Sequence, residues 1–402
     1  MRQWRSAAHQ FLSYVLIPAS GFLAPLLVIP AVTRQFGAEG WAAMAIGQSL
    51  GGSIAVATEL GWGVVGPQRV AGLAEPNRVA EYRRSLTSRA CSVPIGALAA
   101  GSIAFWVAPD KFAVAAAVLA FATTLQGFSP SWYFIGVGKP KAIWLIDSLP
   151  KIITALITAG LILAGAPLVT LGLLTVLGPP IALIGAHRLI RGTVPTREDW
   201  RAGPRVVREQ VVIASGRAVS VVYTALPVTL VGIFAHHSVA EFAASDRLMR
   251  MGLQILQAVP LRLQSWIGSV FGRKKARRIR QAQRLGLGLG ISAGTVFALA
   301  APFASSIIFS GEATISYPVA FCGGLLVFLI QVSTSYGLSL VAIGRANSIT
   351  KAIIPSAIVG ACLIGPSSAA LGAVGAILGQ CASETTGTLV QRREFKKRGS
   401  KK

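Results

Sequence analysis

Three ionisable side chains lie close together in an otherwise apolar segment, "ASDRLMRMGLQ" at residues 244–254. Asp246 and Arg250 stand four residues apart, the spacing at which a carboxylate and a guanidinium pair along a helix. Arg247 and Arg250 share a helical face with Gln254. An ionised group inside a membrane is costly, so it faces a partner or a wet cavity. Two interpretations remain open: a set of salt bridges that fixes helix packing, or a cationic wall for an anionic substrate.

This polar face continues beyond the segment itself. At helical spacing the face reaches Gln257 and extends approximately to Gln264 and Ser265. The expected stripe is therefore about four helical turns long, and it faces something other than lipid.

The elements that carry these residues are expected to be membrane helices. The chain of 402 residues is 53% hydrophobic and only 13% charged, which is too little charge to cover a soluble domain of this size. Its apolar residues come in runs of about 20, the length that a helix needs to cross a bilayer. The sequence therefore predicts an all-α polytopic membrane protein with about twelve transmembrane helices. The runs cover residues 11–33, 42–66, 90–108, 112–135, 143–164, 167–187, 210–233, 239–262, 285–308, 315–343, 349–365 and 368–390.

The distribution of basic residues predicts the orientation of these helices. Most of the 38 Lys and Arg residues fall in loops on the side of the N-terminus or in the C-terminal tail. Only Arg34 and Lys111 fall in the opposite loops. The positive-inside rule then places both termini in the cytoplasm. We interpret basic clusters such as residues 273–284 as orientation signals that touch anionic lipid, and we expect no binding to nucleic acid despite the net charge of +24.

The longest polar loop divides the chain almost in half. We therefore predict an N-terminal six-helix bundle at residues 1–190, a cytoplasmic linker at 191–209 and a C-terminal six-helix bundle with a basic tail at 210–402. Two related bundles are a common plan for transporters. Pro18, Pro25 and Pro30 in the first helix indicate either a static bend or a hinge.

Other polar groups within the spans are weaker candidates. Glu59 is predicted deep in the second helix, where it is either a coupling proton site or part of a packing ion pair. Asp147 and Lys151 are expected to pair with each other at a helix end. The glycines of "GISAG", residues 290–294, are interpreted as a helix-packing stripe. We expect no P-loop, no cofactor and no metal site.

Several stretches resemble a known family. "TRQFGAEGW" (33–41), "ELGWG" (59–63), "QRVA" (68–71) and "PSWYFIGVGKPK" (130–141) are similar to segments of the polysaccharide biosynthesis proteins that act as O-antigen and lipid-linked oligosaccharide flippases. That family belongs to the multidrug/oligosaccharidyl-lipid/polysaccharide exporter superfamily, which is MATE-like. The residue-level match lies mostly in the first 150 residues. The chain departs from the pattern at Ile135 and Gly138, where Gln and Glu are usual in the family.

The resemblance implies a fold and a substrate. The fold is two six-helix bundles around a central cavity, and the substrate is an oligosaccharide on a polyprenyl pyrophosphate that crosses a bacterial cytoplasmic membrane. Guanidinium groups suit a pyrophosphate because they stay ionised and donate parallel hydrogen bonds. The expected substrate-binding residues are therefore Arg247, Arg250, Arg217 and Arg34, with Glu59 and Asp246 as coupling or ion-pair candidates. Membrane lipids and polysaccharide assembly proteins are the expected partners.

Three rival functions remain at this point. A drug or small-cation antiporter of the same superfamily would favour an acidic cavity, whereas the mid-membrane charges here lean basic. A membrane-embedded glycosyltransferase or polymerase would place catalytic groups on sizeable outer loops, which this sequence lacks, so we expect no enzyme. The third rival is a scaffold that recruits assembly proteins through its basic tails.

Overall fold

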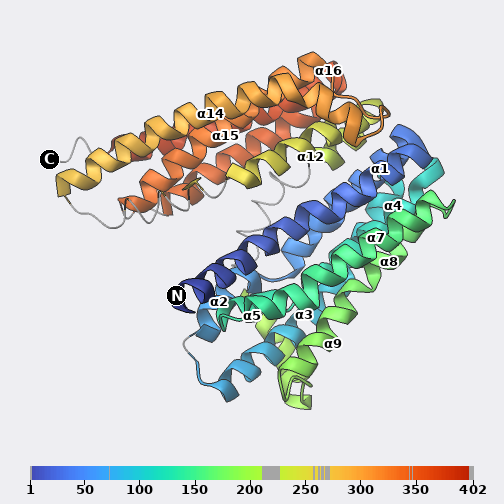
Figure 1. Cartoon of the computed structure of the whole chain (residues 1–402), viewed down its shortest axis with the longest axis vertical. Helices are drawn as coiled ribbons and strands as arrows, with labels where there is room; N and C mark the ends of the chain where they lie inside the picture. The colour runs from blue at the N-terminus through green and yellow to red at the C-terminus, as the bar shows by residue number, and fades with distance from the viewer. Residues whose placement is uncertain are drawn as a thin grey trace. The chain divides into compact units, whose positions relative to one another are not determined.

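The computed structural model describes residues 2–71, 73–210, 227–256, 259–260, 263, 267, 272–343, 345 and 347–397. Side chains are described from residue 26 onward, except at positions 64, 68, 140, 347 and 350. Every regular element in these ranges is helical, as the apolar runs predict (Figure 1). Seven helical stretches of the described chain are long and apolar enough to span a membrane, so this is a multi-pass membrane protein. The count of twelve spans and the cytoplasmic termini stay predictions.

The chain divides into two compact units, Met1–Val221 and Val222–Lys402. In unit 1, α1 packs against α3, α4 and α7, and α4 packs against α8. The helices of unit 1 are α1 (Arg2–Thr58), α2 (Trp62–Ala71), α3 (Glu75–Val107), α4 (Ala113–Thr124), α5 (Ser131–Gly136), α6 (Pro140–Ile143), α7 (Leu149–Leu163), α8 (Val169–Val176) and α9 (Gly178–Leu189), with short helical turns η1 (Asp110–Phe112), η2 (Leu125–Phe128) and η3 (Trp144–Ser148).

In unit 2, the long helices α14, α15 and α16 lie side by side, with α15 packed against both of the others (Figure 1). The shorter helix α12 contacts all three of them. The helices of unit 2 are α11 (Pro227–Phe234), α12 (Val239–Leu256), α14 (Gly272–Ile308), α15 (Tyr317–Ala342) and α16 (Asn347–Lys396), with the turn η4 (His236–Ser238) between α11 and α12.

Two of the helices bend sharply at a glycine. The backbone of α1 turns at Gly37, where φ is 64° and ψ is −160°, and α16 turns at Gly372, where φ is 59° and ψ is −137°. Positive φ strains a residue with a side chain, so glycine is suited to both bends. The bend at Gly37 separates the first two predicted apolar runs, whereas the bend at Gly372 lies within the last one. The prolines of the first run do not break α1, because Gly37 is the one position in it with non-helical dihedrals.

The predicted linker docks on unit 1. Residues 197–210 form a helix whose start is capped by reciprocal bonds between Thr196 and Asp199, at 2.8 to 3.2 Å. Asp199 also pairs with Arg83 of α3 at 2.9 Å, and Glu209 pairs with Arg84. Val206 of this helix is buried in the hydrophobic core of unit 1. The linker helix is therefore held to α3 by ion pairs and by apolar burial.

Glycines provide the close contact between α14 and α15, as the packing stripe predicts. A Cβ added at Gly294 would lie 2.5 Å from the backbone oxygen of Gly324, and one added at Gly290 would lie 3.2 Å from that of Phe328. Ser292, the central residue of "GISAG", donates its hydroxyl to the Leu289 carbonyl at 3.1 Å within the uninterrupted helix. "GISAG" also matches the G-x-S-x-G signature of a nucleophile elbow, but that elbow is a strand-to-helix turn, and these residues lie within one helix. The pattern is thus a packing surface.

This packing gives a paired prediction. Leucine at Gly294 must displace the α15 backbone, whereas a Cβ at Gly288 of the same helix meets nothing within 4 Å. We expect Gly294→Leu to destabilise the protein by about 1–3 kcal/mol, the usual cost of overpacking. Gly288→Leu is expected to leave stability unchanged or to raise it, because glycine is a poor helix former. Thermal unfolding of both variants in detergent micelles measures the difference, and equal unfolding midpoints would refute the assigned contact.

Candidate functional site

The polar segment of the sequence forms the second half of α12. Asp246 and Arg250 pair as predicted, with 2.7 Å between the carboxylate Oδ2 and the guanidinium Nε. The Asp246 side chain is 11% exposed and that of Arg250 is 39% exposed. The buried carboxylate therefore holds a guanidinium group that is still accessible at one end.

Arg247 lies next to this pair, and its guanidinium is incompletely bonded. Its Nε is buried and has no hydrogen-bond partner among the described residues, and the same is true of the Asp246 Oδ1. A buried polar group left unbonded costs about 1–3 kcal/mol, so such groups in a native structure call for a missing partner. A phosphate oxygen would accept from Arg247, and a sugar hydroxyl would accept from Arg247 and donate to Asp246.

The helical spacing of α12 determines which way this polar face points. Met249, Gly252 and Leu256 lie on the opposite side of the helix from Arg247 and Arg250. That opposite side lines an apolar groove of about 430 Å³ together with side chains of α14 and Val327 of α15. Arg247, Arg250 and Gln254 are therefore not used to pack α12 against α14 and α15.

The remaining predicted site residues belong to unit 1 or lie outside the described residues. Arg34 is an exposed residue of α1 in unit 1, whereas Arg247 and Arg250 belong to unit 2. Arg217 lies outside the described residues, as do Gln257, Gln264 and Ser265 of the predicted polar stripe. The structure thus brings together Asp246 and Arg250 with their neighbour Arg247.

The predicted position of Glu59 is wrong. Glu59 does not lie deep in a continuous helix, because the backbone breaks at residues 59–61 between α1 and α2. Leu60 and Gly61 have φ of 58° and 74° there, in the left-handed region. A Cβ at Gly63 would overlap the Glu59 carboxylate, which therefore lies over the first turn of α2. A negative charge at that point is favourable because a helix N-terminus carries partial positive charge.

A second break, in the predicted span 112–135, involves a residue that the sequence analysis did not single out. The side chain of Arg89, on α3, is fully buried. Its Nη1 donates to the carbonyls of Gly127 and Ser129, both at 2.9 Å, and its Nε donates to the Ser85 carbonyl at 3.2 Å. Gly127 and Ser129 flank the point where the helical backbone is interrupted before α5. Arg89 therefore satisfies backbone groups that lipid could not satisfy.

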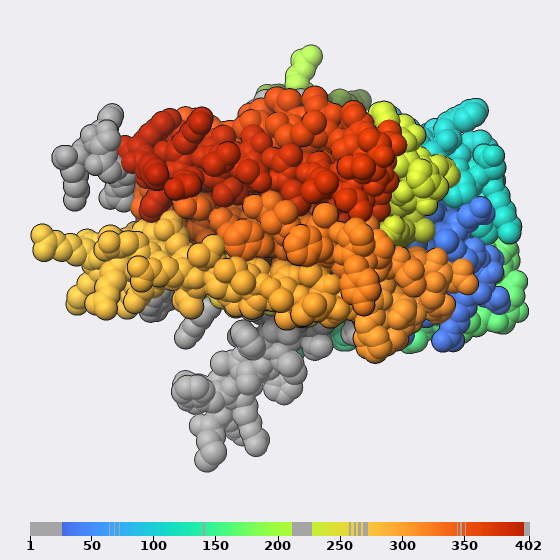
Figure 2. Space-filling model, turned by 90° about the horizontal axis from the view of Figure 1, so that it is seen from above, coloured from blue at the N-terminus to red at the C-terminus, as the bar shows by residue number. Residues whose placement is uncertain are grey.

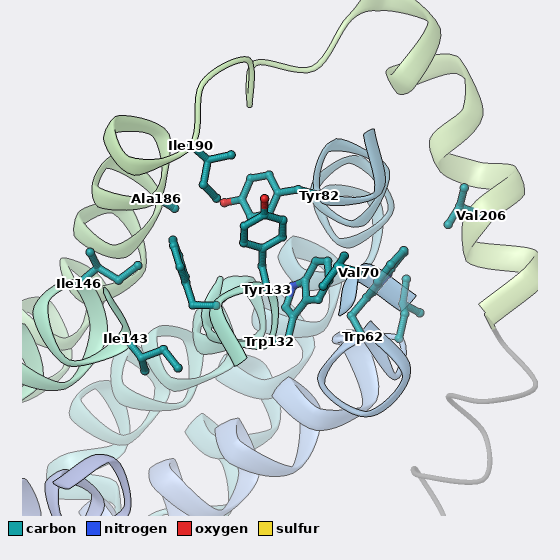
Figure 3. Close-up of a cluster of buried hydrophobic side chains, with 12 residues drawn as sticks. Trp62, Val70, Tyr82, Trp132, Tyr133, Ile143, Ile146, Ala186, Ile190 and Val206 are labelled. Carbon is teal, nitrogen blue, oxygen red and sulfur yellow. The ribbon is translucent and has the colours of Figure 1, made fainter. Parts of the chain in front are cut away.

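Aromatic side chains surround this break: three come from stretches that resemble the flippase family, and Tyr82 comes from α3. Trp62, Tyr82, Trp132 and Tyr133 are all buried and lie against one another (Figure 3). The ring centroids of Trp62 and Trp132 are 5.3 Å apart, and the indole of Trp62 donates to Ser88 at 3.1 Å. We name these four residues, with Arg89, the aromatic junction. Its residues pack on one another, which explains "ELGWG" and "PSWYF" as elements of the core of unit 1.

From the sequence alone, Arg89 is counted among the loop cations that indicate the orientation of the helices. Arg89 is the last cation before the third apolar run, and its position at the end of a basic loop made it look like a topology signal. Charge and position alone do not distinguish a loop arginine from one that folds back into the core.

The predicted pairing of Asp147 with Lys151 is confirmed. Lys151 donates to Asp147 at 3.0 Å, so these two residues form their own ion pair. His236 contacts the Gly232 carbonyl at 3.0 Å through Nδ1. Across the described residues, no group of three or more His, Cys, Asp or Glu side chains is arranged to hold a metal ion.

Comparison with known proteins shows which solved structures share this fold. No protein-family model and no curated protein matches the sequence. Among solved structures, a multidrug resistance MATE family transporter of the MOP superfamily, in an inward-facing conformation, matches 94% of this chain and 96% of its own, with a TM-score of 0.65 and 14% identity. The lipid II flippase MurJ, in an inward closed conformation, matches 95% of this chain and 87% of its own, with a TM-score of 0.64 and 13% identity. A MATE protein in a bent conformation gives a TM-score of 0.52 at 15% identity. The chain therefore has the fold of these proteins over nearly its whole length.

Proposed function

We propose that this protein is a flippase that moves an oligosaccharide linked to a polyprenyl pyrophosphate across the bacterial cytoplasmic membrane. The likeness in fold to MurJ, a lipid II flippase, supports a lipid-linked substrate. The stretches similar to O-antigen flippases support a repeat unit of a surface polysaccharide as the glycan. The likeness in fold to MurJ and to a MATE transporter supports a transporter, and not an enzyme, as the function of this chain.

The observation that carries the proposal is the open hydrogen-bonding capacity of Arg247. Its buried Nε has no partner in the described part of the chain, and Arg247 lies beside an Arg250 that Asp246 orients. Two guanidiniums and one carboxylate leave this cluster with a net positive charge. A pyrophosphate supplies the missing acceptors and the opposite charge, and its bonds to guanidinium are of the strong, charge-assisted kind.

Transport would then proceed by alternating access of the two bundles. The pyrophosphate binds Arg247 and Arg250, with Arg217 and Arg34 as further contacts, while the polyprenyl tail stays in the bilayer. Asp246 fixes Arg250 in place, and Glu59 is a candidate for coupling to an ion. Membrane lipids and polysaccharide assembly proteins are the proposed partners.

One alternative rests on a specific observation. A multidrug MATE transporter matches the fold as well as MurJ does, so export of a drug or small cation is the second candidate. The charge of the α12 cluster opposes it, because a cationic substrate would be repelled by Arg247 and Arg250.

Ligand-induced stabilisation separates the two candidates. Purified protein in micelles is titrated with a polyprenyl pyrophosphate or with tetraphenylphosphonium, and its thermal unfolding is followed. A ligand at 100 times its Kd stabilises the folded state by about 2.7 kcal/mol. We expect the pyrophosphate to raise the unfolding midpoint of the wild type and to have a much smaller effect on Arg247→Gln. Stabilisation by the organic cation alone would favour the antiporter and contradict our proposal.

A further inference from the structure

The basic end of α14 is longer and more regular than an orientation signal requires. The apolar run predicted at 285–308 is preceded by 13 residues, 272–284, that continue the same helix. Seven of the residues between 273 and 284 are Lys or Arg, and the whole helix contains no Asp or Glu. In Figure 2 this golden part of α14 lies at an exposed edge of unit 2.

The arginines of this extension are arranged on one face. Arg277, Arg280 and Arg284 follow at i, i+3 and i+7, and all three are exposed. None of the three forms an ion pair within the part of the chain that the structure describes. The opposite face is the packed one: Ile279 is 5% exposed and Ala282 is 1% exposed. The arginine face therefore points away from the rest of unit 2.

An apolar groove continues directly from this arginine face. The groove has a volume of about 670 Å³ and is lined by Gln281, Arg284, Leu285, Gly288, Leu289 and Ser292. Arg284 belongs to both features, because it ends the arginine face and begins the groove. Gly288 lacks a side chain and leaves open space, and Leu285 is 52% exposed.

The dimensions fit one membrane leaflet. From Leu285 to Ser292 the helix rises about 10 Å, at 1.5 Å per residue, which fits within half of the roughly 30 Å hydrocarbon core. The boundary between charged and apolar residues, at Arg284 and Leu285, is where the membrane surface is expected. A head group at the surface and one acyl chain below it would therefore match the arginine face and the groove.

We propose that this face of α14 is a binding site for an anionic phospholipid. The phosphate and the anionic head group contact Arg277, Arg280 and Arg284, and an acyl chain lies along Leu285, Gly288 and Ser292. Charge complementarity selects the head group, since three exposed cations that form no ion pair within the described chain attract anionic lipid. By the positive-inside rule this site is in the cytoplasmic leaflet. The site is independent of Arg247 and of the transported substrate.

Native mass spectrometry of the full chain in detergent micelles tests the site. The protein is titrated with phosphatidylglycerol or phosphatidylcholine that carry the same 16-carbon chains. We expect the wild type to bind one phosphatidylglycerol about tenfold or more tightly than phosphatidylcholine. The triple variant Arg277→Gln, Arg280→Gln, Arg284→Gln is expected to lose this preference.

Two further variants distinguish a site from a general charge effect. The variant Arg392→Gln, Arg393→Gln, Lys396→Gln removes three exposed cations from another helix of unit 2, and it should keep the wild-type preference. Gly288→Leu fills the groove and keeps every cation, and it should weaken phosphatidylglycerol binding severalfold. The proposal is overturned if the two triple variants lose affinity equally, or if Gly288→Leu binds phosphatidylglycerol as the wild type does.

Discussion

Replacing Arg89 with methionine is expected to destabilise unit 1 by about 2–4 kcal/mol. The carbonyls of Gly127 and Ser129 each lose a hydrogen bond of 2.9 Å from the buried guanidinium. An unbonded buried carbonyl costs about 1–3 kcal/mol. The variant no longer has to bury the guanidinium charge, and the desolvation energy that is saved offsets part of this cost. Trp62 and Trp132 lie in the same junction, so thermal unfolding followed by tryptophan fluorescence reports the loss.

A matched variant on the same helix isolates the buried contact. Arg84 is 38% exposed and pairs with Glu209 at the surface, so Arg84→Met is expected to cost at most about 1 kcal/mol. The loss of stability in Arg89→Lys should fall between the losses in Arg89→Met and Arg84→Met. A lysine has a single side-chain nitrogen and cannot reproduce all three carbonyl contacts. Equal stability of Arg89→Met and the wild type would show that Arg89 does not support the break before α5.

The helical fold was predictable because apolar runs of membrane length leave few alternatives. Hydrocarbon cannot satisfy backbone groups, so any such run must be helical wherever it meets lipid. The interruptions were harder to predict, because they depend on tertiary partners. At the break near Glu59, Ser92 of α3 donates to the Thr58 carbonyl at 2.7 Å. No local sequence pattern predicts that contact.

The candidate site was predictable only where it depends on the spacing of residues along one helix. The spacing of Asp246 and Arg250 fixes their pairing on any α-helix, and the structure confirms the pair. The unbonded Nε of Arg247 could not be predicted, because it depends on which atoms approach from neighbouring elements. Arg89 shows another case: its guanidinium bonds the carbonyls of Gly127 and Ser129, which are distant in sequence, and no local pattern predicts those contacts.

Loss of Arg247 is expected to have the largest effect on transport. Replacing it with glutamine keeps a polar but shorter side chain and removes the charge and the guanidinium donors. A charged hydrogen bond is worth about 1.5–3 kcal/mol, so we expect transport to fall about 10- to 100-fold while the amount of inserted protein is unchanged. Asp246→Asn should have a smaller effect, because it only loosens Arg250. Lys151→Gln, which breaks an ion pair elsewhere in the membrane, should transport at the wild-type rate.

The most direct test is translocation in vesicles that contain the purified full-length protein. A fluorescent oligosaccharide on a polyprenyl pyrophosphate is placed in the bilayer, and its appearance in the opposite leaflet is followed by quenching from one side. We expect the wild type to move it, and the variant Arg247→Gln, Arg250→Gln to move it at the rate of empty vesicles when inserted in equal amount. Movement by the double variant at the wild-type rate, or none by the wild type, would contradict the proposed function.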